Sequence, residues 1–160
     1  MIMKIRKLLL LSVTHTAMLT FGFILGIYVL PIITAPPSPT KSEIAELSIQ
    51  ADYETEFIRG LKGSDALHWG VGKVTISQDY VTLLGEISPG PEYKLYLSPS
   101  FVETEAEFEQ LKSTMKLVGD VKTFDNFIVK VDPNINLSQF NTVVVWCEAF
   151  GEFITSAKYR

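Results

Sequence analysis

The hydrophobic pattern divides the chain into an apolar N-terminal stretch and a longer region of short, alternating segments. From Leu8 to Ile33 about 26 residues pass without a formal charge, which is long enough to cross roughly 30 Å of hydrocarbon with some tilt. A cleaved signal peptide is the alternative, but residues 33–36 fit the small-residue cleavage pattern poorly. The pattern therefore predicts one uncleaved transmembrane helix, with residues 1–33 forming a basic end and a membrane anchor.

The charges that flank the apolar stretch predict its orientation. Three cations precede it and one lies close behind it: Lys4, Arg6 and Lys7, then Lys41. The positive-inside rule places the N-terminus in the cytoplasm and everything after Pro31 outside it. We thus expect a single-pass membrane protein that is held in the membrane by residues 8–33. Gly22 and Gly26 form a small-xxx-small pair at which two such helices could approach closely as a homodimer.

Residues 34–60 are predicted to connect the anchor to a folded domain. Three prolines at the start of this segment favour an extended, polyproline-like stalk. Thr40 and Glu43 then have the spacing of a capping box, and apolar residues recur at roughly helical intervals from Ile44 toward Gly60. We expect a short amphipathic helix here, which either packs on the domain or remains a solvated spacer.

From residue 61 onward the chain has short runs of β-branched and aromatic residues separated by turn residues. These runs predict strands near residues 70–77, 80–86, 93–98, 127–131, 142–146 and 152–159. One helix is expected between Phe101 and Met115, where apolar residues return at helical spacing after Thr104. Because parallel crossovers would need a helix after nearly every strand, residues 61–160 are expected to be mainly β, an antiparallel β-sandwich with one inserted helix.

Composition and charge restrict the functions that this domain could have. Three of the 14 cations precede the apolar stretch, so the rest of the chain carries 11 cations against 18 acids, a net charge of −7. Nucleic acid is therefore not an expected partner. The single cysteine, Cys147, excludes an intrachain disulfide and leaves a free thiol, a metal ligand or an intermolecular link.

Motifs for metal binding or catalysis do not accompany this cysteine. The domain has no Cys-x-x-Cys motif and no histidine cluster, so we expect neither a metal site nor a cofactor. His68 is its only histidine, and no nucleophile-elbow motif is present. No enzyme class is indicated.

Several segments of the domain together resemble the DM-thirteen domain family. They are residues 90–98 (GPEYKLYLS), Val118-Gly119, residues 143–150 (VVVWCEAF) and Ala157, within a resemblance that extends roughly from Leu67 to Tyr159. The family is a predicted β-sandwich of secreted or membrane-tethered proteins, and the single cysteine in its Trp-Cys-x-x-Phe setting has a proposed electron-transfer role. The resemblance implies a redox role for Cys147 and also covers His68 and Gly72, which match a His-x-x-x-Gly entry to the first strand. His68 and Trp146, the neighbour of Cys147, are the candidate binding residues.

The residues themselves leave a second function open. Residues 124–128 (FDNFI) replace the Gly-x-Gln-x-Tyr segment of many members, so a ligand contact from that glutamine is absent here. No cation adjoins Cys147 to lower the pKa of its thiol, and Trp146 and Phe150 are expected in the core. The alternatives are electron transfer at Cys147 with a redox partner, or a non-catalytic binding or adhesion module that recognises a component of the cell envelope.

Overall fold

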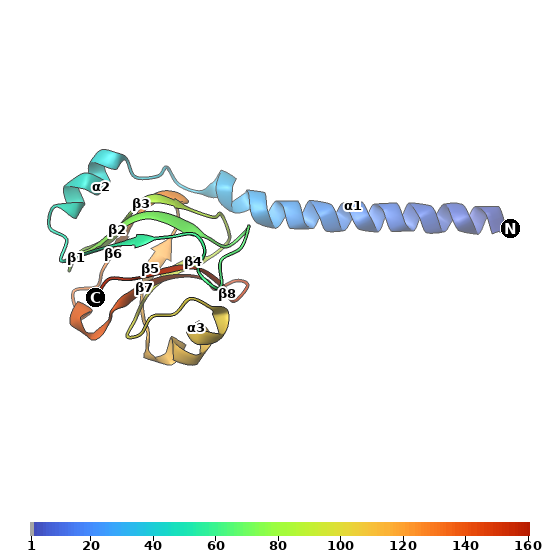
Figure 1. Cartoon of the computed structure of the whole chain (residues 1–160). Helices are drawn as coiled ribbons and strands as arrows, with labels where there is room; N and C mark the ends of the chain where they lie inside the picture. The colour runs from blue at the N-terminus through green and yellow to red at the C-terminus, as the bar shows by residue number, and fades with distance from the viewer. Residues whose placement is uncertain (1) are drawn as a thin grey trace.

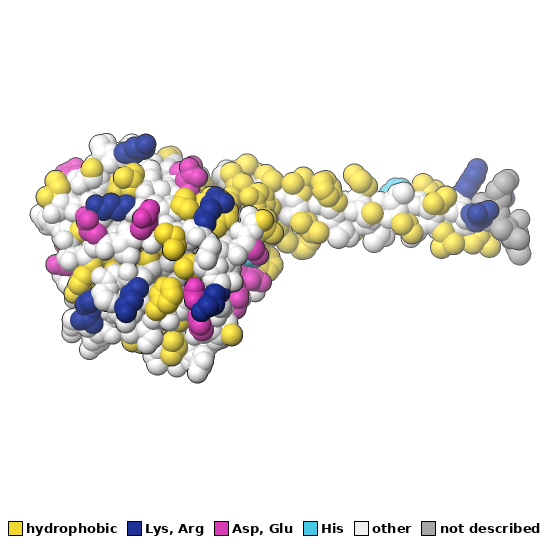
Figure 2. Space-filling view, viewed as in Figure 1, with side chains coloured by type: hydrophobic (Ala, Val, Ile, Leu, Met, Phe, Trp, Pro, Cys, Tyr) yellow, Lys and Arg dark blue, Asp and Glu magenta, His cyan; other side chains and the backbone are white. Residues whose placement is uncertain are grey.

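The computed structural model describes residues 2–160 and shows a β-sandwich joined to one long helix (Figure 1). This helix, α1, spans Ile2–Thr34 and points away from the sandwich. Its residues 4–34 are long and apolar enough to cross a membrane, and their position near the N-terminus also suits a signal sequence. Apolar side chains cover α1, and its lysine and arginine side chains lie at the end far from the domain (Figure 2).

Eight strands form two antiparallel four-stranded sheets that face each other (Figure 1). The first sheet has the order β1-β2-β3-β6, formed by Tyr53–Phe57, Gly70–Ile76, Tyr80–Ile87 and Asp125–Lys130. The second has the order β5-β4-β7-β8, formed by Lys116–Val121, Tyr93–Ser98, Thr142–Cys147 and Glu152–Lys158. The predicted antiparallel β-sandwich is confirmed.

Strand β7 lies between β4 and β8 in the second sheet, and all its residues are buried, in keeping with the continuously apolar run from Val143 to Trp146. Side chains of a strand point alternately to opposite faces of the sheet. Val145 and Cys147 therefore enter the core between the two sheets, whereas Val144 and Trp146 enter a second apolar cluster on the outer face. Adjacent residues of β7 therefore contribute to two separate hydrophobic clusters, one on each face of the second sheet.

The predicted inserted helix covers that outer face. Helix α3 spans Glu105–Leu111, continues as the 3₁₀ turn η1 (Lys112–Thr114) and ends before β5, so it is shorter than the predicted segment. Its cap is the predicted one, because the amide of Glu107 donates to Oγ1 of Thr104 at 3.3 Å. A second 3₁₀ turn, η2, spans Leu137–Gln139.

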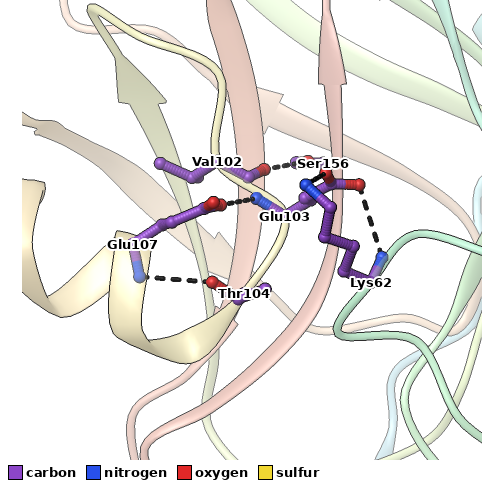
Figure 3. A network of polar contacts seen from close by, with 6 residues as sticks. All are labelled: Lys62, Val102, Glu103, Thr104, Glu107 and Ser156. Atoms are coloured by element: carbon purple, nitrogen blue, oxygen red, sulfur yellow. Dashed lines mark hydrogen bonds and ion pairs between the residues drawn. The ribbon is translucent and has the colours of Figure 1, made fainter.

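A polar network fastens the start of α3 to the loop that follows β1 (Figure 3). The ammonium group of Lys62 pairs with the carboxylate of Glu103, and the amide of Glu103 donates to Oε2 of Glu107 at 2.8 Å. The hydrogen bond from the Lys62 side chain lowers the pKa of Glu103, although burial opposes it. These contacts hold the loop against the start of α3, so the network has a structural role.

The connecting helix is shorter than its sequence pattern suggested. Helix α2 spans Lys41–Ser48 and begins with the predicted capping box, in which Thr40 and Glu43 exchange hydrogen bonds. It packs on the first sheet, since Ile44 is buried and Ser48 Oγ lies 3.1 Å from Thr75 Oγ1. The sequence left open whether this helix packs on the domain or remains a solvated spacer, and the structure shows that it packs on the domain.

The prediction that this helix continues toward Gly60 is wrong. Residues 53–57 form β1, which pairs with β2 at the edge of the first sheet. Tyr53, Thr55 and Phe57 alternate with two glutamates, a strand pattern that the helical spacing of the upstream apolar residues obscured. Strand β5 was also not predicted, because it is short, contains Gly119 and directly follows the α3 segment.

Gly72, the glycine of the His-x-x-x-Gly segment, has a structural role. It lies opposite Gly85 in the β2–β3 pair and has a φ of +126°, outside the range that other residues favour. A Cβ at this position would lie 2.4 Å from the carbonyl oxygen of Leu84. The glycine therefore permits a close approach of two backbones.

Replacing Gly72 with alanine should lower the free energy of unfolding by about 2–3 kcal/mol, because it adds a backbone clash to an unfavourable φ. Gly60→Ala is the matched control, since Gly60 also has a positive φ but a Cβ there would meet no atom within 4 Å. Its cost should be about 1 kcal/mol. Urea unfolding of the two variants measures both values, and equal losses would show that the clash does not matter.

Candidate functional site

Cys147 lies at the end of β7, where the chain turns toward β8. Its side chain is 3% exposed, and its thiol donates a hydrogen bond to the carbonyl oxygen of Pro91 at 3.1 Å. The turn is closed by a hydrogen bond from the amide of Gly151 to the carbonyl oxygen of Cys147 at 2.9 Å. The thiol is therefore held in place and shielded from solvent.

The surroundings of Cys147 favour the neutral thiol over the thiolate. Burial raises the pKa of the thiol, the amides of Phe150 and Ala149 act in the opposite direction, and the carboxylates of Glu152 and Glu92 raise it further. The net effect places the pKa above its ordinary value of 9.0. Near neutral pH the resting side chain is consequently a protonated thiol.

His68 lies in the loop that leads into β2 and is oriented by Asp65. One oxygen of Asp65 accepts hydrogen bonds from the amides of Leu67 and His68, and its other oxygen lies 3.1 Å from Nδ1 of His68. The amide of Leu67 and the histidine lower the pKa of this carboxyl, although burial opposes them. In the neutral imidazole this contact places the proton on Nδ1, which leaves Nε2 as a hydrogen-bond acceptor.

A pocket of about 290 Å³ brings Cys147 and His68 together at the junction of the sandwich and α1. The two side chains are far apart in sequence, and among residues 4–160 no hydrogen bond joins them. The pocket is mainly apolar, with lining residues Ile24, Ile27, Tyr28, Leu67, His68, Pro89, Gly90, Pro91, Tyr93, Cys147, Phe150, Glu152 and Ile154. We refer to it as the junction pocket.

Part of the junction pocket wall comes from α1, which sequence reasoning did not assign to the site. Ile24, Ile27 and Tyr28 line it from the end of the helix near the domain. The uncharged stretch is longer than the roughly 20 residues that a bilayer requires, and this excess is the signal that could have indicated a contact between helix and domain. A larger pocket of about 430 Å³ nearby is lined by charged residues such as Lys94 and Asp120 but not by Cys147.

Trp146 does not line the junction pocket. Its indole is fully buried on the opposite face of the sheet and stacks on the ring of Phe108, with 3.9 Å between ring centroids. The predicted core position of Trp146 is confirmed. The predicted core position of Phe150 is wrong. The residue is 54% exposed at the rim of the pocket, because it lies in the turn after β7.

Next to this stacked pair, Glu148 joins a small charged network. Its carboxylate accepts hydrogen bonds from the Tyr96 hydroxyl and, at 2.9 Å, from Nζ of Lys112. Burial raises the pKa of Glu148, but these two partners outweigh it and the net shift is downward. The residue therefore anchors the η1 turn to the sheet as a carboxylate.

Asn126 fastens the proline-rich stalk to the domain. Its side-chain amide donates to the carbonyl oxygen of Pro39 at 3.0 Å and accepts from the amide of Gly85 at 3.1 Å. Its φ of +54° is a left-handed conformation that asparagine tolerates better than most residues. This role lies within residues 124–128, where the sequence departs from the family pattern, and sequence reasoning did not find it.

The arrangement limits the chemistry that the site can perform. Within the described residues, no three His, Cys, Asp or Glu side chains are grouped as metal ligands. The junction pocket instead offers one neutral thiol, one oriented imidazole and an apolar wall. Such a site can bind a small, largely apolar group or hold a thiol for exchange with a partner.

Fold and site together define a β-sandwich module joined to an apolar N-terminal helix, with a lone thiol at the junction. A family model described as electron transfer DM13 matches residues 60–159. The chain therefore belongs to the DM-thirteen family. Neither a curated protein nor a solved structure matches it significantly.

Proposed function

We propose that the chain is a single-pass membrane protein whose DM-thirteen domain lies outside the cytoplasm and takes part in electron transfer through Cys147. The observation that carries this proposal is the place of the only thiol, which lines the junction pocket beside His68. Membership of a family described as electron transfer supports it.

The proposed location rests on the charges and length of α1. Its cations lie at the end far from the domain, which favours a cytoplasmic N-terminus. The helix has 33 residues and is thus about 50 Å long, more than the roughly 30 Å of hydrocarbon in a bilayer. Its last turns can therefore leave the hydrocarbon and pack on the domain. Gly22 and Gly26, which have open space around them, could bring two such helices together as a homodimer.

A single cysteine can exchange electrons by thiol–disulfide exchange with a partner that brings its own disulfide. The Cys147 thiolate attacks one partner sulfur, a mixed disulfide forms, the partner's S–S bond breaks, and the leaving sulfur takes up a proton. Cys147 is oxidised and the partner thiol is the reduced product. A second, reduced protein with two thiols can then displace the first partner from Cys147 and close its own disulfide. This restores the Cys147 thiol and passes two electrons from the dithiol to the first partner.

The geometry of the junction pocket makes this exchange selective. A buried thiol with a raised pKa reacts slowly with small disulfides in solution. A partner that docks at the rim formed by Leu67 and Phe150 would reach the thiol through the pocket. Slow reaction with bulk reagents and fast reaction with one partner is the behaviour that a specific redox link needs.

The non-catalytic binding module is the second candidate. The hydrogen bond from the thiol to Pro91 and its 3% exposure favour this function, because they are also the properties of a structural cysteine. In that case the junction pocket or its rim recognises an envelope component, and Cys147 only forms part of the wall.

Trapping of disulfides in intact membranes separates the two candidates. Acid quenching and alkylation block the free thiols. Mixed disulfides of the full chain are then detected by comparing reducing with non-reducing gels, and the state of Cys147 is determined by mass spectrometry of its peptide. The redox proposal predicts a mixed disulfide that Cys147→Ser abolishes. A thiol that stays fully reduced under oxidising conditions, together with unchanged partner binding by Cys147→Ser, would support the binding module instead.

A further inference from the structure

The position of the junction pocket relative to the membrane restricts what can enter it. If the hydrocarbon begins after Lys7, about 20 helical residues bring its outer boundary to the level of Ile27. Ile24, Ile27 and Tyr28, which line the pocket, then lie at the outer edge of the bilayer. A molecule dissolved in the membrane can therefore reach the pocket without crossing water.

The size and lining of the pocket favour a single ring. A cavity of about 150 Å³ is large enough for benzene, so about 290 Å³ accommodates a substituted six-membered ring but not a whole lipid. Aromatic side chains from both parts of the molecule, Tyr28, Tyr93 and Phe150, contribute to its wall. Offset or edge-on contacts with such side chains stabilise a planar ring more than they stabilise an alkyl chain.

The polar groups of the pocket select for a neutral ring that carries oxygen. Glu152 lines the pocket and Glu92 lies close enough to affect the Cys147 thiol, so a phosphate head group would be repelled. Nε2 of a neutral His68 can accept a hydrogen bond from a ring hydroxyl, and the Tyr28 hydroxyl can donate one to a ring carbonyl.

We infer that the junction pocket binds the head group of a lipid-soluble quinone, with its isoprenoid tail in the bilayer. The inference rests on the proposed function, since it gives the electron-transfer domain a carrier from the membrane. Binding is reversible, and no bond forms between the ring and Cys147. The hydroquinone hydroxyl donates to His68, and the oxidised ring accepts from Tyr28.

Photolabelling of the full chain in lipid nanodiscs tests this inference. The probe is a fully substituted alkyl benzoquinone that carries an aryl azide, so that no free ring position can add a thiol, and labelled peptides are identified by mass spectrometry. Labelling should saturate and concentrate on peptides that contain Tyr28, Leu67 or Phe150. An excess of the same quinone without the azide should compete at least about tenfold better than an alcohol with the same alkyl tail.

Two variants of α1 provide a matched pair. Ile24→Trp places an indole in the pocket, whereas Leu25→Trp adds the same group at the next residue, which does not line the pocket. Both positions are exposed on the helix, so neither change disturbs the sandwich core. Saturable labelling should fall about tenfold in Ile24→Trp and stay within about twofold of the parent in Leu25→Trp. Equal effects in the two variants, or equal competition by the alcohol, would overturn the inference.

Two measurements on the parent protein separate this inference from the proposed function: saturable labelling by the quinone probe, and disulfide exchange at Cys147 in the same nanodiscs. Saturable labelling without disulfide exchange would support the quinone site and contradict the redox role of Cys147. Disulfide exchange without saturable labelling would support the redox role and contradict the quinone site.

Discussion

Replacing Trp146 with alanine should lower the free energy of unfolding by about 3–5 kcal/mol. The indole is fully buried in the cluster beneath α3 and stacks on Phe108, which is buried as well. The change leaves a cavity between sheet and helix that the fixed backbone of β7 cannot close. Thermal and urea unfolding followed by far-ultraviolet circular dichroism measure the loss without relying on tryptophan fluorescence.

Two further variants identify the cause of this loss. The indole Nε1 has no hydrogen-bond partner among the described residues, so Trp146→Phe should cost less than about 1.5 kcal/mol because it keeps most of the ring and removes an unsatisfied donor. Phe150→Ala, at an exposed position of the same motif, should change stability by less than about 0.5 kcal/mol. A larger loss for Phe150→Ala than for Trp146→Ala would contradict the assignment of Trp146 to the core.

Alkylation of Cys147 should be about 100-fold slower in the native protein than in the unfolded chain near pH 7. Only the thiolate reacts, and the native thiol is both shielded and shifted to a higher pKa, above 9.0. Between about pH 7 and pH 9 the native rate should rise nearly tenfold per pH unit, since the thiolate fraction grows in this way below the pKa. The unfolded chain should level off near its ordinary thiol pKa.

The same shift predicts how stability depends on pH. Below the pKa of the unfolded thiol both states hold the proton, and stability does not depend on this group. As the pH rises above that value the unfolded chain releases its proton first, so the native state loses stability until the native pKa is passed. Cys147→Ser should remove this part of the pH dependence. A native rate that levels off below pH 8 would show an activated thiolate and contradict the surroundings described for Cys147.

The sandwich could be predicted because the residues of its central strands are by themselves typical of strands. The run of apolar residues in β7 and the turn between β2 and β3 identify strands without knowledge of their partners. Edge strands are less easily predicted, because pairing with a neighbour stabilises them more than their own composition does. The edge strands β1 and β5 were both missed, whereas the edge strands β6 and β8 were predicted from their own β-branched and aromatic residues.

The candidate site was predictable only in part. The motif around Cys147 identified the thiol, and its resemblance to the family also indicated His68, but no spacing in the sequence shows that both line one pocket. The wall from α1 depends on how the helix packs on the domain, which is a tertiary property. Trp146 was predicted both as a binding residue and as a core residue. Alternation along β7 places its side chain in the outer cluster, on the face away from Cys147.

The redox role of Cys147 is tested most directly by a glutathione titration of the full chain in lipid nanodiscs. The protein is equilibrated at about pH 8 with different ratios of reduced to oxidised glutathione, and the adduct on Cys147 is quantified by mass spectrometry. We predict one adduct per native chain that forms slowly, follows the glutathione ratio reversibly and is absent in Cys147→Ser. An adduct that appears only after unfolding would contradict the redox role and identify Cys147 as a structural thiol.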